Sequence, residues 1–251
     1  MCLKRSKLKK MVLKPLFANN LYIIEFSMEL QRTISSTKGF QSIQNYEKFE
    51  SISSKYFNSR PNFSNKKKLG LKQCYLYFLM DPRISRNLPV SAKENSLKEL
   101  KIWQRFLNSI FYVGKAKSTR PYSHLHNAIK IYNKQELDDK AECLNAIVSD
   151  IQAPKFSKVD HIIDIWRNGF GVVNLHVFHN ILPYEAYTRE AAVIDAISLP
   201  NLTNQKRGVY YGPPSKWTAK GRERLGIALL YRAMKIFLSE GEIQLYPFDL
   251  A

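Results

Sequence analysis

Three short apolar runs, separated by segments of helical periodicity, most constrain how residues 71–251 can fold. The first, CYLYFLM, ends at the turn signal Asp81-Pro82, and the second, IFYVG, begins at Ile110. The third, VVNLHVFHN, alternates apolar and polar residues from Val172. With helices between them, the three runs predict a small mixed three-stranded sheet flanked by helices, α/β or α+β in class.

Caps and periodicity predict the helices. NSLKELKIWQRFLNS carries a capping-box pattern at Ser96 and Glu99, and SKVDHIIDIWRNG has Ser157 as an N-cap and Gly169 as a stop. Pro121 suits the first turn of another helix. PYEAYTREAAVIDAIS and an added C-terminal helix, RERLGIALLYRAMKIFLSEG, complete the order. The inward residues of the helix after Pro121 are expected to be Leu125, Ala128, Ile129 and Tyr132.

Residues 1–70 differ from the rest in charge and pattern. They hold 14 Lys and Arg against 4 Asp and Glu, with Ser/Asn-rich tracts and weak periodicity. We therefore expect residues 1–70 to be a basic, largely flexible segment and residues 71–251 to be the folded domain. The first 17 residues fit a solvated basic tail, a nuclear-import signal or, less well because lysine outnumbers arginine, a mitochondrial presequence.

The charge balance points to a polyanionic partner. The chain of 251 residues carries a formal net charge of +18 and has a sequence pI near 9.7, which favours nucleic acid first and an anionic membrane surface second. No apolar run is long enough to span a bilayer. The three cysteines, Cys2, Cys74 and Cys143, are scattered, which argues against a disulfide framework or a cysteine zinc site.

The stretch FYVGKAKSTRPYSHL gathers cations where the second strand ends. Gly114 is followed by Lys115, Lys117 and Arg120, and then by a helix N-terminus with His124 one turn inside. Helix N-termini and arginine both favour phosphate, and a histidine can move a proton near neutral pH. The pattern alone predicts either a phosphate site or solvated lysines after a strand.

A glutamate lies within the apolar stripe of the helix from Tyr184 to Ser198. At about 100° per residue, Glu190 falls among apolar side chains, while Thr188, Arg189, Ala192 and Asp195 form the opposite face. A carboxylate in such a stripe needs a partner. It is either a structural salt bridge, for example to an arginine of another helix, or a metal ligand or acid–base group; the helical pattern favours neither. The apolar stripe consists of Ala186, Tyr187, Val193, Ile194 and Ile197.

These motifs together resemble the GIY-YIG endonuclease family. Its signature is a tyrosine from each of two strands, an arginine after the second strand, a helix glutamate and a later asparagine. The matching residues are Tyr77 for the first motif, Tyr112 and Gly114 for the second, then Lys115, Arg120, His124, Glu190 and Asn204. Tyr75 stands where the first motif usually has glycine.

The resemblance is closest to the ankyrin-repeat and LEM-domain endonucleases of animals. It covers residues 73–251 and includes CYLYFLMDPR, IWRNGFGVVNLHVFHN and LTNQKRGVYYG. Neither ankyrin repeats nor a LEM domain is recognisable in residues 1–72.

The resemblance implies a magnesium- or manganese-dependent endonuclease that hydrolyses phosphodiester bonds in branched, flapped or distorted DNA, with a role in DNA repair. Glu190 would bind the metal, which would act as a Lewis acid, and Arg120 with Lys115 would neutralise charge on the phosphoryl oxygens. Tyr77, Tyr112 or His124 would deprotonate or orient the attacking water. The choice among these three groups stays open.

The sequence also predicts roles for polar and aromatic residues outside these motifs. We expect Lys216, Lys220, Arg222 and Arg224 to hold the DNA backbone, although Arg222 and Arg224 equally fit a solubilised helix face. We expect His161, His176 and His179 to be ordinary polar residues. Tyr210 and Tyr211 either pack, which we favour, or stack on a base.

Two other functional classes compete with the nuclease. A catalytically inactive nucleic-acid-binding module would have the same basic charge but no need of Glu190. A membrane-surface protein would bind lipid through residues 1–70, and no membrane insertion is expected. The expected location is the nucleus, the cytoplasm or both, with mitochondria a weaker alternative.

Overall fold

An antiparallel sheet with the strand order β4-β3-β5-β6 forms the centre of the protein. The computed structural model describes residues 13–15, 21–23, 26–59, 73–117, 122–142 and 157–250. The long strands are β3 (Cys74–Met80), β4 (Ile110–Ala116) and β5 (Val172–Ile181), where the sequence predicts them. The predicted α+β class is confirmed. The sheet is antiparallel rather than mixed, and it gains a two-residue edge strand, β6 (Gln244–Leu245), too short to leave a periodic signal.

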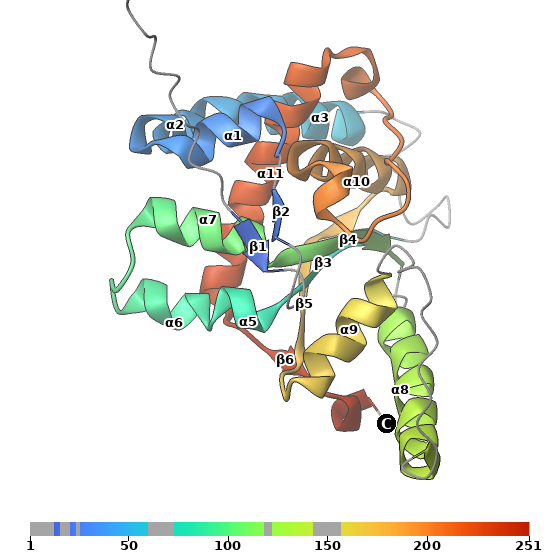
Figure 1. Cartoon of the computed structure of the whole chain (residues 1–251). Helices are drawn as coiled ribbons and strands as arrows, with labels where there is room; N and C mark the ends of the chain where they lie inside the picture. Colours follow the sequence, from blue (N-terminus) through green and yellow to red (C-terminus); the bar gives the residue numbers. More distant parts are fainter. Residues whose placement is uncertain are drawn as a thin grey trace, which may run out of the picture.

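Helices cover both faces of this sheet (Figure 1). On one face lie α7 (Glu99–Ser109), α10 (Pro183–Ile197) and α11 (Ala219–Glu240). On the other lie α8 (Tyr122–Glu142) and α9 (Lys158–Arg167). Shorter elements join them: α5 (Pro82–Ser85), α6 (Leu88–Lys93), η2 (Leu199–Asn201), η3 (Pro213–Lys216) and η4 (Pro247–Leu250).

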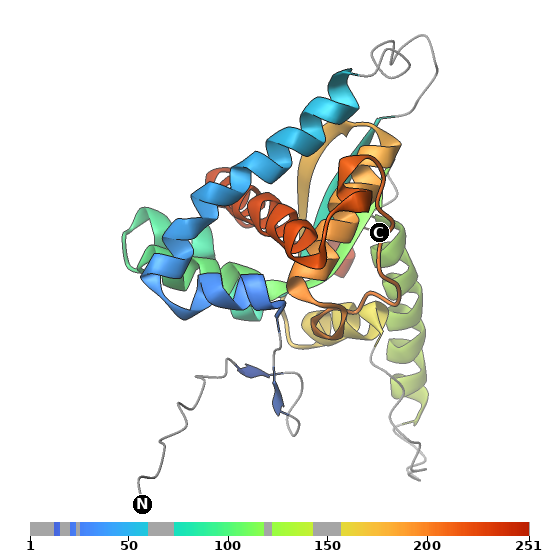
Figure 2. The same cartoon turned by 90° about the horizontal axis from the view of Figure 1, so that it is seen from above.

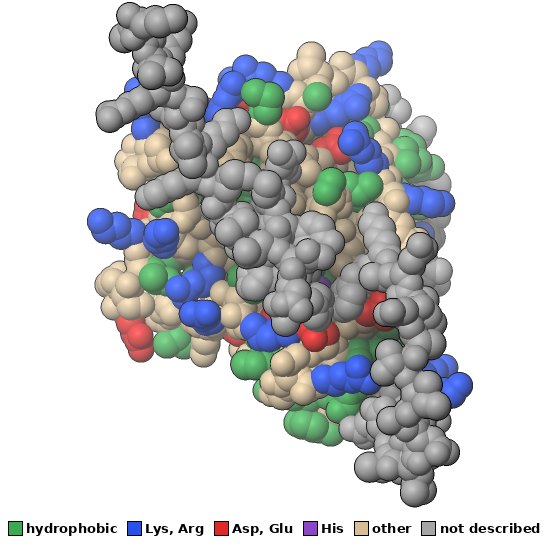
Figure 3. Space-filling view, in the orientation of Figure 1, with side chains coloured by type: hydrophobic (Ala, Val, Ile, Leu, Met, Phe, Trp, Pro, Cys, Tyr) green, Lys and Arg blue, Asp and Glu red, His purple; other side chains and the backbone are tan. Residues whose placement is uncertain are grey.

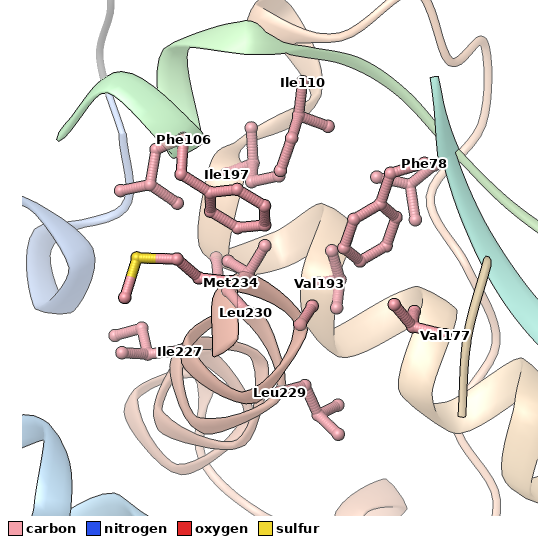
Figure 4. Close-up of a cluster of buried hydrophobic side chains, with 14 of the residues drawn as sticks. Phe78, Phe106, Ile110, Val177, Val193, Ile197, Ile227, Leu229, Leu230 and Met234 are labelled. Carbon is pink, nitrogen blue, oxygen red and sulfur yellow. The ribbon is translucent and has the colours of Figure 1, made fainter. Parts of the chain in front are cut away.

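Each face of the sheet has its own core. Side chains of β3, α7, α10 and α11 meet in the larger one, where Phe78, Phe106, Val193 and Leu230 are buried (Figure 4). The smaller core lies under α8 and α9 and includes Leu125 and Ala128, as predicted. None of the helices in the described ranges is both long enough and apolar enough to cross a membrane.

Two of the predicted helix boundaries are confirmed and one is wrong. Ser157 and Asp160 form a reciprocal capping box at the start of α9, and Gly169 follows its end at φ 78°. The capping box predicted at Ser96 does not form: α7 begins at Glu99 after Lys98, whose side chain makes no capping hydrogen bond.

Helix α10 is buried on nearly all sides, which corrects its predicted orientation. Thr188, Arg189 and Ala192 are buried because α3 (Glu47–Ser59) and α11 cover the face opposite the apolar stripe. Arg189 donates to Glu185 at 3.0 Å from Nε and to Glu50 of α3 at 3.0 Å from Nη1. Tyr187, expected inside, is 38% exposed.

Four helical segments before the sheet belong to the same folded body. They are α1 (Met28–Ser35), α2 (Thr37–Gln41), η1 (Ser42–Tyr46) and α3 (Glu47–Ser59), and they lie alongside α11 (Figure 2). Leu30 and Ile43 are buried in the larger core. Trp103 Nε1 donates to Thr33 Oγ1 at 3.1 Å, and Arg224 Nε donates to Glu29 Oε2 at 2.7 Å.

The expectation of a largely flexible segment over residues 1–70 is therefore wrong for residues 28–59. Their apolar residues are few and spread over short helices, so the sequence shows weak periodicity although each helix buries one side. The strands β1 (Leu13–Pro15) and β2 (Leu21–Ile23) form a separate two-stranded antiparallel sheet. A domain boundary near residue 71 stays a prediction.

Candidate active site

The two motif tyrosines lie on neighbouring strands. Tyr77 of β3 pairs in register with Gly114 of β4, and its ring centroid is 5.9 Å from that of Tyr112. A Cβ atom on Gly114 would lie 2.5 Å from Cζ of Tyr77. Glycine is needed here because the Tyr77 ring crosses directly over the β4 backbone.

Both phenols are protonated at neutral pH. Burial raises the pKa of Tyr77 well above its usual range, and the neighbouring Tyr112 and Glu190 raise it further. Burial also raises the pKa of Tyr112; the hydrogen bond that Tyr77 donates to it lowers this pKa and the Glu190 charge raises it. Tyr77 is only 3% exposed, whereas Tyr112 lines an open cleft.

His124 approaches the same tyrosines from α8. Its ring centroid lies 5.4 Å from Tyr112 and 6.5 Å from Tyr77. Burial, followed by the nearby Lys158 charge, lowers the pKa of His124 to about 4. The imidazole is therefore neutral at pH 7, and its Nε2 atom lies 3.2 Å from Lys158 Nζ, which donates to it.

Glu190 is 9% exposed and, within the described residues, forms an ion pair with Lys115 rather than with an arginine of another helix. Lys115 Nζ donates to Glu190 Oε2 at 2.6 Å and lies 4.0 Å from the ring centre of Tyr187. Burial raises the pKa of Glu190 above its ordinary value, against the lowering effect of Lys115. The pair therefore joins α10 to the end of β4 at the edge of the sheet.

An open cleft of about 540 Å³ brings these groups together. It lies between the end of β4, the start of α9, α10 and the segment from 203 to 209. Its polar lining is Tyr112, Lys115, Ser157, Lys158, Tyr187, Glu190, Thr203, Asn204, Gln205, Lys206 and Arg207. Among the described residues, four cationic side chains thus share the cleft with one carboxylate.

Asn204 lines the cleft, and its side-chain amide is used on the backbone of β4. Oδ1 accepts from Val113 N at 3.0 Å and Nδ2 donates to Val113 O at 2.7 Å. Thr203 N donates to Phe111 O at 2.7 Å. The segment after η2 thereby covers the free edge of β4 next to Tyr112, which makes Asn204 a positioning residue in this structure.

Of the other predicted cations that the structure describes, none lines the cleft. Lys117, Lys216 and Lys220 are exposed, and Arg120 lies outside the described residues. Figure 3 shows Lys and Arg side chains scattered over one face of the molecule.

Arg222 and Arg224 have structural partners. Arg222 donates to the carbonyl groups of Pro214 and Ser215 at 3.0 and 2.6 Å, and Arg224 pairs with the buried Glu29. For these two arginines the contacts favour a structural role over backbone binding.

Three cleft cations were missed by the sequence analysis: Lys158, Lys206 and Arg207. Lys158 is the first residue of α9, directly after the Ser157 cap, so the cap was the available signal. Lys206 and Arg207 follow Asn204. A Cβ atom on Gly208 would lie 2.5 Å from Ala191 Cα, and this close approach to α10 holds the segment at the cleft.

The histidines and tyrosines that were expected to be ordinary polar or packing residues lie outside the cleft. His161 pairs with Asp81 at 3.0 Å and stacks on Phe111 at 4.2 Å. Tyr210 donates to Asp195 at 2.7 Å, so Asp195 is hydrogen-bonded and only partly exposed.

A hard divalent cation in the cleft would find one carboxylate ligand among the described residues and would take its other ligands from elsewhere. Glu190 supplies one buried carboxylate, and no group of three or more His, Cys, Asp or Glu side chains is arranged to hold a metal ion in the described parts of the chain. Magnesium is commonly bound by one or two carboxylates together with substrate phosphates and water.

Comparison with known proteins identifies relatives of this region. Residues 74–251 match the family described as the LEM-3-like GIY-YIG domain. The chain is 41% identical over 180 residues to the human ankyrin repeat and LEM domain-containing protein 1, a match that covers 72% of this chain and 27% of the relative. No solved structure gives a significant match.

Two further relatives are similar. The mouse ankyrin repeat and LEM domain-containing protein 1 is 41% identical over 179 residues, which covers 71% of this chain and 30% of that protein. The Caenorhabditis elegans homologue is 33% identical over 167 residues, 66% of this chain and 20% of that protein. The chain therefore spans less than a third of the length of each of these relatives.

Proposed function

The chain belongs to the LEM-3-like GIY-YIG family, whose fold is that of a nuclease domain, and on this premise we propose that it is a metal-dependent endonuclease acting on branched or distorted DNA. The observation that supports this most directly is the shared cleft, in which Tyr112, Lys115 and Glu190 meet. Pure nucleic-acid binding has no need of a buried carboxylate among cations.

Glu190 is the proposed ligand of Mg²⁺ or Mn²⁺. A divalent cation bound there would supply Lewis-acid stabilisation of the scissile phosphate. Lys115 pairs with Glu190 at 2.6 Å. Because a phosphate oxygen is a strong acceptor for an ammonium group, we expect Lys115 to turn from Glu190 to the phosphoryl group when DNA binds.

The other cations of the cleft would neutralise charge on the phosphoryl oxygens. Lys158, Lys206 and Arg207 line the same space as Tyr112, and Arg120 is proposed to join them on grounds of the family motif. Fixed cations around a transferring phosphoryl group lower the barrier through electrostatic stabilisation. Lys117, Lys216 and Lys220 are proposed to contact the DNA backbone farther from the cleft.

Tyr112 is the proposed group that orients the attacking water, because it lines the cleft and Tyr77 lies behind it. Its raised pKa means that it donates or accepts a hydrogen bond as a neutral phenol unless cations stabilise the phenolate. The Nε2 atom of His124 is occupied by Lys158. His124 can accept a proton from water only after Lys158 has moved to a phosphate.

The direct test uses the full chain on a flapped DNA and a linear duplex of the same sequence. We expect nicking of the flap with Mg²⁺ or Mn²⁺, little cutting of the duplex, and no cutting in EDTA. The alternative, a catalytically inactive nucleic-acid-binding module, predicts binding to the flap without cleavage under any metal condition. Cleavage that persists in EDTA would contradict the metal requirement.

Lys158→Met should weaken DNA binding because it removes a cleft cation and keeps most of the side-chain length. The logarithm of the DNA-binding constant falls with the logarithm of the salt concentration, and the slope of this line should become less steep by about 0.9 for one lost phosphate contact. The pKa of His124, about 4, should rise because one of its two lowering causes is removed. Salt-dependent anisotropy and an NMR titration of the imidazole measure the two effects.

Lys93→Met is the matched control, because Lys93 is exposed on α6 and away from the cleft. A Lys158→Met protein whose salt dependence equals that of Lys93→Met would contradict the assignment of Lys158 as a phosphate ligand.

The proposal extends to the cell location and the domain organisation. The basic charge of the chain is compatible with a location in the nucleus, the cytoplasm or both, where a nuclease would meet DNA. A boundary near residue 71, where the nuclease motifs begin, remains our proposal, with α1 to α3 packed against the nuclease part within one folded body.

A further inference from the structure

Four ring-bearing side chains form a cluster that the proposed chemistry does not use. Tyr75 of β3 stacks on His179 of β5, with ring centroids 5.3 Å apart and planes 23° apart. The ring centroid of His176 lies 4.9 Å from that of Tyr75 and 6.2 Å from that of Tyr122 of α8. We call Tyr75, Tyr122, His176 and His179 the ring cluster.

The ring cluster continues the candidate active site across the sheet. His176 pairs in register with Tyr77, and Tyr75 is two residues before Tyr77, so both share its face of the sheet. Tyr122 precedes His124 by two residues on α8. The row therefore runs from Tyr112 on β4, over Tyr77, to the rings on β5.

An unusual backbone presents His179 to this face. The β3–β5 register shifts between Cys74 and Leu76, and the residues on both sides of His179 have positive φ, 57° at Phe178 and 63° at Asn180. Asparagine tolerates this region but phenylalanine rarely adopts it. Such bulges and strained residues are often found near functional sites, where they redirect a side chain.

Packing beneath the ring cluster holds the strained stretch from Phe178 to Asn180 in place. Phe178 is buried, and the guanidinium groups of Arg189 and Arg232 lie 4.9 and 5.7 Å from its ring centre. His179 itself is exposed and Tyr75 is half-buried. The structure thus fixes the backbone and leaves the outer ring open to solvent.

Polar atoms next to the rings have no partner within the described part of the chain. Nε2 of His176 and both side-chain polar atoms of Asn174 are buried without a hydrogen bond. Asn174 and His176 are two residues apart on β5, on the same face of the sheet. A buried polar atom left unpaired costs about 1–3 kcal/mol, so such atoms are normally satisfied by ordered water or a ligand.

We propose that Tyr75 and His179 form a stacking site for an unpaired nucleobase of the DNA substrate. Stacking on aromatic rings tolerates any base, because every base has a flat π-face. The site shares its face of the sheet with Tyr77 and Tyr112, and Tyr112 lines the cationic cleft, where the phosphate of the same strand would bind. This inference rests on the proposed function, and it gives a physical reason for preferring branched over fully paired DNA.

The test measures binding by the full chain carrying Glu190→Gln, so that the DNA is not cut. Tyr75→Leu and His179→Ala should each weaken binding to a DNA with an unpaired flap by about tenfold, the size of one lost stacking partner. Binding to a linear duplex should not change. Tyr75→Phe keeps the ring and should bind as the parent does, and 2-aminopurine in the flap should lose its quenching in the two weak variants.

Phe248→Ala is the control, because Phe248 is an exposed residue stacked on Tyr246 outside the ring cluster. The proposal is overturned if Tyr75→Leu and His179→Ala bind flap and duplex as Phe248→Ala does, or lose both equally. Wild-type cleavage is assayed in parallel. If the wild type never cuts DNA but the two variants lose flap binding specifically, the nuclease proposal is wrong and the stacking site stands. If the wild type cuts DNA and the two variants show no such loss, the stacking site is wrong and the nuclease proposal stands.

Discussion

Glu190→Gln is expected to lower the rate of flap cleavage by on the order of 10³-fold, about 4 kcal/mol in the barrier, because it removes the proposed metal ligand. The substitution keeps the size of the side chain and leaves Lys115 free to bind phosphate. DNA affinity should therefore stay close to that of the wild type. Single-turnover cleavage and equilibrium binding, measured on the same flap, separate the two effects.

Asp195→Asn is the matched control on the same helix. Asp195 accepts a hydrogen bond from Tyr210 and does not line the cleft, so the variant should cut at nearly the wild-type rate. If Glu190→Gln and Asp195→Asn cleave equally well, Glu190 is a structural partner of Lys115 and the metal assignment is wrong.

The sequence is most informative where a local pattern decides the structure. The strand from Cys74 to Met80 has the predicted bounds, because its apolar run ends at the turn Asp81-Pro82. The start of α9 follows from Ser157, and the inward position of Glu190 follows from helical spacing. In each case the determining residues lie within a few positions of one another.

The sequence alone could not predict contacts between segments that lie far apart in the chain. The identity of the Glu190 partner depends on where β4 ends relative to α10, 75 residues away in sequence. The sequence left an arginine of another helix as one possibility, and Lys115 proved to be the partner. Asn204 was predicted on resemblance alone; its pairing with the Val113 backbone comes from the packing of a non-repetitive segment against a strand edge.

Helices α1 to α3 were missed for a related reason. Their buried residues, such as Leu30, Ile43 and Phe57, belong to short helices whose polar residues dominate the pattern. The surface that covers them is formed largely by α11, which follows much later in the chain. A sequence window over residues 28–59 contains no information about that surface.

Removing residues 1–72 is expected to prevent stable folding of the remainder, because the larger core of the sheet would lose one of its walls. Leu30, Ile43 and other residues of α1 to η1 belong to that core, and Trp103 would lose its hydrogen bond to Thr33. Folded domains are stable by only about 5–15 kcal/mol. The exposed surface should therefore yield an aggregating or molten fragment, detected by near-UV circular dichroism and urea unfolding.

A point substitution in the full chain measures how much α1 contributes to the free energy of unfolding. Leu30→Ala should lower the free energy of unfolding by about 2–5 kcal/mol, the usual effect of truncating a fully buried leucine. Ile52→Ala on α3 is the control, because Ile52 is 49% exposed and an exposed position should change stability by only about 0.5 kcal/mol. Equal unfolding midpoints for the two variants, or a 73–251 fragment as stable as the full chain, would mean that α1 to α3 do not stabilise the domain. A loss confined to Leu30→Ala would make residues 28–59 an integral part of the fold that carries the cleft.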